Sequence, residues 1–186
     1  MSDIFSKSNQ IQLNTQQNDK TEDRQFLKFY LHEGSKAMLP VEHITEVLKV
    51  QYSQIVPIPQ MPSWVMGVYN WRGDILWMVD LGHLIGGNPW YQQGMNFSKH
   101  TAIVLSPNKK RNKVNAENKI DLGLVVSQVE DIEMCNIADI QVPPNSSPAT
   151  GLETFLQGYW LQSAGDMIMV LNALSIIAAV PNNAAQ

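Results

Sequence analysis

Hydrophobic and polar residues alternate along much of the chain with the two-residue period of a β-strand. In QFLKFYLH, Leu27, Phe29 and Leu31 alternate with Lys28 and Tyr30, which predicts a half-buried strand. Similar extended runs are expected at residues 37–41, 101–105 and 120–126. Many short strands separated by turn signals favour a mainly β protein.

The clearest pair of strands is a hairpin at residues 66–70 and 74–79, joined by the sequence WRG. Gly73 supplies the backbone freedom that such a turn requires. Apolar residues occupy both faces of the second strand, so we expect it to be buried on both sides.

Two short helices are predicted from their end residues. Asp80 precedes LGHLI, and Asn172 precedes ALSIIAAV. Asp and Asn are favoured N-cap residues, because their side-chain oxygens accept hydrogen bonds from the first turn of a helix. Gly86 and Gly87 follow the first segment and Pro181 the second, and both residue types commonly end helices.

The chain also contains an internal repeat. The segment GDILWMVDLGHLI, from Gly73, aligns without a gap on GDMIMVLNALSII, from Gly165, and LPVEHITEVL aligns on LVVSQVEDIE. Ile55 in IVPIP falls on Ile140 in IQVPP at the offset of that second pair of segments. The repeat predicts two similar small units, each of about five strands, packed against each other as two small barrels.

The pattern predicts the following division of the chain. Residues 1–24 are rich in Asn and Gln and are expected to be a disordered tail. Residues 25–181 form the folded part, with the first barrel at about 35–100 and the second at about 101–165. An exchange of terminal strands between the two barrels stays open. Residues 182–186 are expected to be a short tail.

Composition narrows the class of protein. The 186 residues include 13 basic and 17 acidic residues, a formal net charge of -4. This balance argues against a nucleic-acid partner. A single cysteine, Cys135, excludes an internal disulfide framework. The sequence has no run typical of membrane insertion, and its start, MSDIFSKSNQ, does not resemble a secretory signal, so we expect a cytoplasmic protein.

Sequence motifs give no support for catalysis. The four histidines, His32, His43, His83 and His100, lack the close spacing of metal ligands, and neither CxxC nor HExxH occurs. The chain also lacks GxSxG, Walker and GxGxxG motifs. We therefore expect a protein that is not an enzyme and that needs no metal or cofactor.

The segment around the WRG turn is the best candidate for function. Arg72 should project from the tip of the hairpin, beside Trp71, and these two residue types dominate interface energetics. The alternative is that Arg72 only pairs with a nearby acid such as Asp74, and that Trp71 only covers core. The residues alone leave both interpretations open.

Longer motifs resemble the CheW-like domain, a family of coupling proteins, over residues 26–180. They are FLKFYL, LPVEHITEVL, IVPIPQMPSWVMGVYNWRGDILWMVDLGHLIG and GLVVSQVEDIE. The resemblance implies two five-stranded SH3-like barrels on a shared hydrophobic core, with short helices. It also implies a non-catalytic adaptor. Its partners would be the cytoplasmic tip of a methyl-accepting chemoreceptor and the regulatory domain of a CheA-type histidine kinase.

The resemblance also implies a set of partner-binding residues. Arg72 matches the arginine of the family's RG turn, Gly67 and Gly73 match the glycines that bracket the hairpin, and Glu46 matches the acid of the EV segment. Trp71, which stands where the family commonly has Leu, and Asn70 of the same turn are added as further candidates for partner binding. WVMGVYNWRGDILWMVDLG is similar to the cyanobacterial branch associated with pilus-based phototaxis. Recruitment to membrane receptor arrays would follow.

Two other function classes stay open from the sequence. A small barrel that binds a ligand would need a polar pocket between the lobes, yet the residues expected there, Ile75, Trp77, Met167 and Met169, are apolar. A self-assembling structural module would use the exposed edge strands of its barrels.

Overall fold

The computed structural model describes residues 22–31, 34–92, 98–106, 120–142, 151–162 and 165–180. Its strands are β1 (Asp23–Tyr30), β2 (Lys36–Pro40), β3 (Ile44–Gln51), β4 (Val65–Trp71), β5 (Asp74–Asp80), β6 (Lys99–Leu105), β7 (Asp121–Val126), β8 (Gln128–Asn136), β9 (Ile140–Gln141), β10 (Leu156–Leu161) and β11 (Met167–Leu171). Its helices are α1 (Leu81–Leu84), α2 (Gly151–Phe155) and α3 (Ala173–Ala179), with short 3-10 turns η2 (Val41–His43), η3 (Tyr52–Gln54), η4 (Trp90–Gln92) and η6 (Ile137–Asp139).

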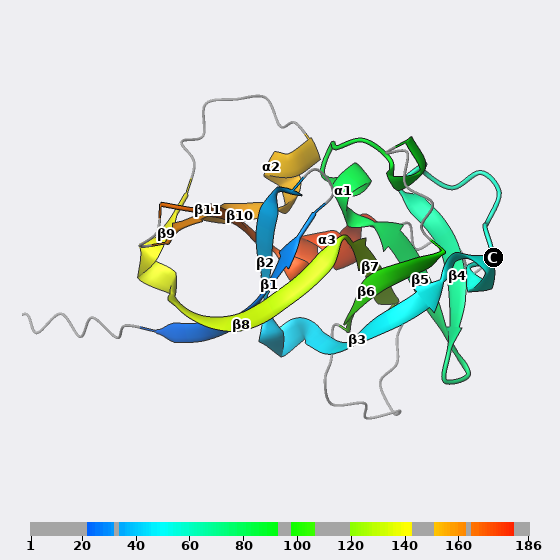
Figure 1. Cartoon of the computed structure of the whole chain (residues 1–186), viewed down its shortest axis with the longest axis horizontal. Helices are drawn as coiled ribbons and strands as arrows, with labels where there is room; N and C mark the ends of the chain where they lie inside the picture. Colours follow the sequence, from blue (N-terminus) through cyan, green and yellow to red (C-terminus); the bar gives the residue numbers. More distant parts are fainter. Residues whose placement is uncertain are drawn as a thin grey trace, which may run out of the picture.

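The strands form two sheets that lie side by side as two lobes (Figure 1). The first lobe has five strands in the order β3-β6-β7-β5-β4, and the second has six in the order β8-β1-β2-β11-β10-β9. The expected fold class, a mainly β protein of two small barrels with short helices, is confirmed. The sixth strand of the second lobe, β9, is the one addition to the expected five.

Each lobe closes in the same way. After β3, the chain turns through η3, and Val56 pairs with Val68 of β4 at the opposite edge of the sheet. After β8, it turns through η6 into β9, which pairs with β10. The internal repeat read from the sequence is thus a repeat of structure. Closure leaves few free edges, which small sheets otherwise expose to other chains.

The division of the chain between the lobes differs from the expected boundaries at 35–100 and 101–165. Strands β6 and β7 belong to the first lobe, while β1 and β2 join the C-terminal strands in the second. Asp23 and Arg24 lie in β1 and not in a tail, because they pair with Asn136 and Cys135 of β8. The rest of the expected tails, 1–21 and 182–186, lies outside the described residues.

A large apolar core joins the two lobes. Both lobes contribute to it, through Leu27 and Leu39 from the second and Val79 and Leu124 from the first, and α3 packs into it through Ile176. Figure 1 shows α3 between the two sheets. Each lobe also has a smaller core of its own. A core shared in this way allows two units, each too small for independent stability, to stabilise each other.

Four apolar residues were expected at the junction, and only two of them lie there. Trp77 is buried in the shared core, and Met169 packs against it. Ile75 is 66% exposed and Met167 is 63% exposed, because both lie at the outer ends of their strands, beyond the contact between the lobes.

The strand β1 is not half-buried as expected. Lys28 is buried like its apolar neighbours, because both faces of β1 are covered. Its ammonium group lies 2.5 Å from Glu133 Oε1 and 3.3 Å from Asp131 Oδ1 on β8. Burial lowers the pKa of Lys28, but hydrogen bonds and charges from Glu133 and Asp131 outweigh this, so the pKa is raised and the side chain stays charged.

The predicted helix caps are confirmed. Asp80 Oδ1 accepts a hydrogen bond from the His83 amide at the start of α1, and Asn172 Oδ1 accepts one from the Ser175 amide at the start of α3. Asp80 is buried, and its second oxygen accepts from the amide of Trp90, which fixes η4.

Candidate functional site

The candidate site is built on the turn between β4 and β5. Trp71 pairs with Asp74, so Arg72 and Gly73 form a two-residue loop. Both have left-handed backbones, with φ of 54° and 91° respectively. This geometry belongs to the type I′ turn, whose twist matches that of the flanking strands. Asn70 stabilises the loop by accepting a hydrogen bond from the Gly73 amide (3.0 Å).

Arg72 projects from this turn, and its side chain is 69% exposed. Its Nη2 atom lies 2.7 Å from Glu46 Oε2. Glu46 belongs to β3, at the other edge of the sheet, and closure of the barrel brings it to the turn. Arg72 therefore pairs with Glu46 and not with Asp74, the partner considered from the sequence.

Trp71 points into the first lobe. It is 6% exposed and packs in that lobe's own core, which also contains Val50, Leu76 and Val104. Its indole N–H donates a hydrogen bond to Glu46 Oε1. Of the two interpretations left open for Trp71, coverage of the core is the one that the structure favours.

Gly67 differs from its expected place at a contact surface. It is buried, its φ is 139°, and a Cβ atom built on it would lie 2.2 Å from the carbonyl oxygen of Val56. Glycine is needed here because the closing segment crosses β4 at this point. Gly158 of β10 has the same relation to Gln141 in the second lobe, with a Cβ to carbonyl oxygen distance of 2.7 Å. The other five expected residues meet around the turn.

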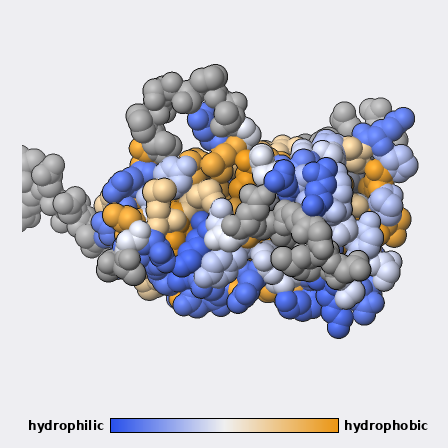
Figure 2. Space-filling model, turned by 45° about the horizontal axis from the view of Figure 1, so that its top comes forward, coloured by the Kyte–Doolittle hydropathy of each residue, from blue (hydrophilic) through white to orange (hydrophobic). Residues whose placement is uncertain are grey.

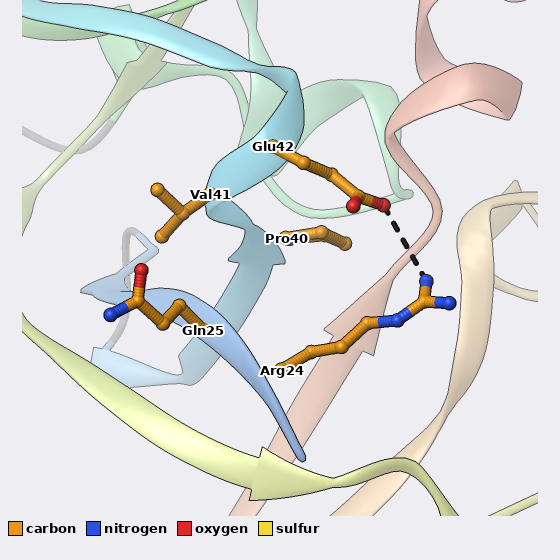
Figure 3. A pocket seen from close by; sticks show the side chains of 5 residues that line it. All are labelled: Arg24, Gln25, Pro40, Val41 and Glu42. Carbon is orange, nitrogen blue, oxygen red and sulfur yellow. Dashed lines mark hydrogen bonds and ion pairs between the residues drawn. The ribbon is translucent and has the colours of Figure 1, made fainter. Parts of the chain in front are cut away.

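A pocket of about 270 Å³ lies where the start of β1 meets the end of β2 and η2 (Figure 3). It is lined by Arg24, Gln25, Pro40, Val41 and Glu42. Arg24 Nη1 lies 3.5 Å from Glu42 Oε1 across one side of it.

Exposed apolar side chains flank this pocket on β8. Met134 pairs with Gln25 of β1, and Ile132 pairs with Leu27, two residues further along β1. Both Ile132 and Met134 are more than half exposed. Sequence reasoning missed the pocket, because its lining comes from two segments whose proximity follows only from strand pairing. The one local hint of the pocket in the sequence is the segment VEH, residues 41–43, which directly precedes β3.

A second apolar surface lies at the far end of the second lobe. Leu161 of β10 pairs with Met167 of β11, and both side chains are exposed. Figure 2 shows apolar surface gathered on this lobe, beside hydrophilic regions. Exposed apolar pairs of this kind are typical of contact surfaces when they cluster.

Both ring nitrogens of His83 are hydrogen-bonded, and Cys135 is buried. His83 Nδ1 donates to the carbonyl of Gly87 (3.1 Å), and its Nε2 is hydrogen-bonded to Ser63 Oγ (2.8 Å), which ties the proline-rich segment to α1. Burial raises the pKa of Cys135 to about 11, so the thiol is protonated at neutral pH and is a poor nucleophile. Within the described ranges, no group of three or more His, Cys, Asp or Glu residues is arranged to hold a metal ion.

Comparisons with known proteins agree on one family. The family model described as the CheW-like domain matches residues 25–180. The protein named chemotaxis protein CheW from Klebsiella aerogenes is 26% identical over 134 residues, 70% of this chain and 70% of that protein. Its namesake from Helicobacter pylori is 28% identical over 82 residues, 44% of this chain, and the match spans about half of that relative, 47% of its length.

Among solved structures, the scaffolding protein TtCheW from Thermoanaerobacter tengcongensis has the same fold. The TM-score is 0.65 at 20% sequence identity, and the match covers 87% of this chain and 97% of that one. Among the helices described, none combines the length and hydropathy of a membrane span.

Proposed function

Because the chain belongs to the CheW-like domain family, we propose that it is a non-catalytic adaptor that couples methyl-accepting chemoreceptors to a CheA-type histidine kinase. The observation that carries the proposal is the family match over residues 25–180, together with an exposed arginine held at the tip of a rigid turn in the first lobe. The adaptor binds two partners at once, and a signal passes because the state of the receptor changes which contacts are favourable.

The receptor contact is assigned to the surface that follows β3. Figure 1 shows the start of β3 beside the second lobe and the β4–β5 turn toward the other end of the first lobe. The pocket at Val41 and Glu42 lies just before β3, and Glu46, the partner of Arg72, is the third residue of β3. A helical hairpin, such as a receptor tip, could therefore contact the pocket and the Arg72–Glu46 pair together. Arg72 offers planar donors, and Ile132 adds apolar contact area.

The kinase contact is assigned to the apolar surface of the second lobe around Leu161 and Met167. Its partner is the regulatory domain of the kinase. Two separate surfaces allow both partners to be bound together, which a coupling protein requires.

The junction between the lobes favours an adaptor over a ligand-binding barrel. A metabolite site there would need a hollow with convergent polar groups. Instead, the junction is filled by buried apolar side chains, such as Phe29, Leu39 and Leu122, which belong to the shared core.

The proposed place of action is the cytoplasm, at membrane receptor arrays. The narrower proposal, an output in pilus-based phototaxis, depends on the similarity of WVMGVYNWRGDILWMVDLG to the cyanobacterial branch of the family.

The test measures binding of the full chain to a purified receptor-tip hairpin fragment and to a purified kinase regulatory domain, by calorimetry. Arg72→Ala should weaken receptor binding by about 2 kcal/mol, the usual effect of removing an interface anchor. It should leave kinase binding unchanged. Receptor binding by Arg72→Ala as tight as that of the parent would show that the site is misassigned.

Two further variants control for folding and charge. Arg72→Asn also removes the guanidinium, but asparagine tolerates a left-handed backbone, so its loss of binding cannot come from turn strain. Lys36→Ala removes a partly exposed cation from the second lobe, where it pairs with Asp166 away from the assigned surface, and should leave receptor binding unchanged.

A further inference from the structure

The two oxygens of the Glu46 carboxylate have different donors. Oε1 accepts the indole N–H of Trp71, and Oε2 accepts Nη2 of Arg72 at 2.7 Å. The guanidinium carbon of Arg72 also lies 5.6 Å from the Trp71 ring centre, in cation–π contact. Trp71, Arg72 and Glu46 therefore form a closed set of three contacts, which we name the Trp71 clamp.

The members of the clamp differ in burial. The Trp71 ring is buried in the first lobe's core and cannot rotate without leaving it, whereas Arg72 is exposed at the tip. The Glu46 side chain is 22% exposed and lies between them. Trp71, whose ring is fixed in the core, therefore holds Glu46 by a hydrogen bond, and Glu46 in turn holds Arg72.

An exposed Arg–Glu pair is usually mobile, because ordering two long side chains cancels most of the attraction between them. Here a second donor to Glu46, the N–H of a buried ring, restricts the rotamers of Glu46 before any partner arrives. The guanidinium is then already oriented, while the Arg72 side chain stays 69% exposed. Orientation before binding lowers the entropy lost on binding.

We propose that Trp71 is a positioning residue that does not touch the partner and that strengthens binding by orienting Arg72 through Glu46. The assignment rests on the proposed function, since it concerns the same surface. It distinguishes Trp71 from Arg72, with which it was grouped as a contact residue from the sequence.

The geometry is tested without a partner, by NMR of the full chain labelled with ¹⁵N. The chain has five tryptophans, and the Trp71 indole signal is identified by its loss in Trp71→Phe. Glu46→Ala should shift this signal and speed its hydrogen exchange at least tenfold, because the acceptor is removed. Arg72→Ala should leave the exchange of the indole slow. An indole signal that does not respond to Glu46→Ala would overturn the proposal.

The role in binding is tested by a double-mutant cycle with the receptor-tip fragment. Trp71→Phe removes the N–H and should weaken binding about three- to tenfold, the usual benefit of one pre-ordered side chain. In an Arg72→Ala background, the same substitution should have no further effect. An equal loss in both backgrounds would show direct contact or general destabilisation, and would overturn the positioning role.

A second variant guards against misfolding of Trp71→Phe. Replacing Trp71 by benzothienylalanine keeps the shape of the ring and lacks only the N–H donor, so it should give the same three- to tenfold loss in a chain with unchanged melting temperature. Unchanged binding in this variant would overturn the proposal.

Failure of the proposed function is distinguishable from failure of this proposal. If the parent binds neither the receptor fragment nor the kinase domain, the proposed function fails, and the binding role of Trp71 fails with it. The indole spectrum still reports whether the Trp71 clamp exists.

Discussion

Arg72 occupies a backbone conformation that ordinary residues avoid. Its φ of 54° costs about 1 kcal/mol relative to glycine or asparagine at the same position. The hydrogen bond from Gly73 to Asn70 and the Glu46 contact hold it there. Glycine or asparagine would form this turn with less strain, so the strain at Arg72 indicates that the arginine side chain itself has a function at this position.

Gly67 and Gly73 have positive φ angles for different reasons, and substitution separates them. Gly67→Ala should destabilise the protein by more than about 3 kcal/mol, because the new Cβ atom would lie 2.2 Å from the Val56 carbonyl oxygen. Gly73→Ala, whose Cβ atom would meet nothing within 4 Å, should cost only about 1–2 kcal/mol of backbone strain. Urea denaturation of both variants measures the difference. Equal costs would show that the close approach to Val56 relaxes freely.

The strands β1 and β8 are joined by charge as well as by their backbone ladder. Lys28 of β1 contacts Glu130, Asp131 and Glu133 of β8 at 2.5 to 3.4 Å. Gln162, next to β10, donates to the other oxygen of Glu133 (2.8 Å), so the acid also links β8 to the β10 side of the lobe. A buried lysine beside several acids thus links two strands that are far apart in the sequence.

Lys28→Met should lower the free energy of unfolding at pH 7 by about 2 kcal/mol. Breaking a fully buried pair costs roughly 3–5 kcal/mol, and the loss is smaller here because the acids keep some contact with water. The pKa of Lys28 is raised above its ordinary value of 10.5, so its stabilisation is complete below that pH and is lost as the pH rises through the folded-state value.

The control for this substitution is Lys49→Met. Lys49 is exposed, and its ammonium group bonds the neutral hydroxyl of Thr101, so the change should cost less than about 0.5 kcal/mol. Chemical denaturation at pH 7 compares the two. Similar small effects from both substitutions would contradict a stabilising role for the charged cluster on β8.

The shared core makes the two lobes one cooperative unit. Its buried side chains come from both sheets and from α3, and neither lobe can lose its partner without exposing them. The order of strands adds to this, because the chain enters the second lobe, crosses to the first and returns. Separate folding of the lobes is therefore not expected.

Leu39→Ala should lower the melting temperature, and both lobes should still unfold together in one thermal transition. Leu39 is fully buried in the shared core, and such truncations cost roughly 2–5 kcal/mol. Calorimetry should give equal calorimetric and van't Hoff enthalpies in parent and variant. Leu161→Ala, an exposed truncation in the same lobe, should change stability by less than about 0.5 kcal/mol. Two resolved transitions in either protein would contradict a shared core.

Short-range features could be read from the sequence because neighbouring residues decide them. The hairpin at β4 and β5, the caps Asp80 and Asn172 and the repeat were predicted correctly, since turn geometry and helix caps depend on a few adjacent residues. The resemblance of the motifs also indicated the fold class correctly.

Contacts between distant segments were decided only by the tertiary structure. The pairing of Asp23 with Asn136, the membership of β6 and β7 in the first lobe, and the burial of Gly67 all depend on which strands become neighbours. The same holds for the Trp71 clamp, because Glu46 reaches the turn only when the barrel closes. A two-residue alternation shows that a strand has two faces, but the face that meets the other lobe is set by packing of the whole chain.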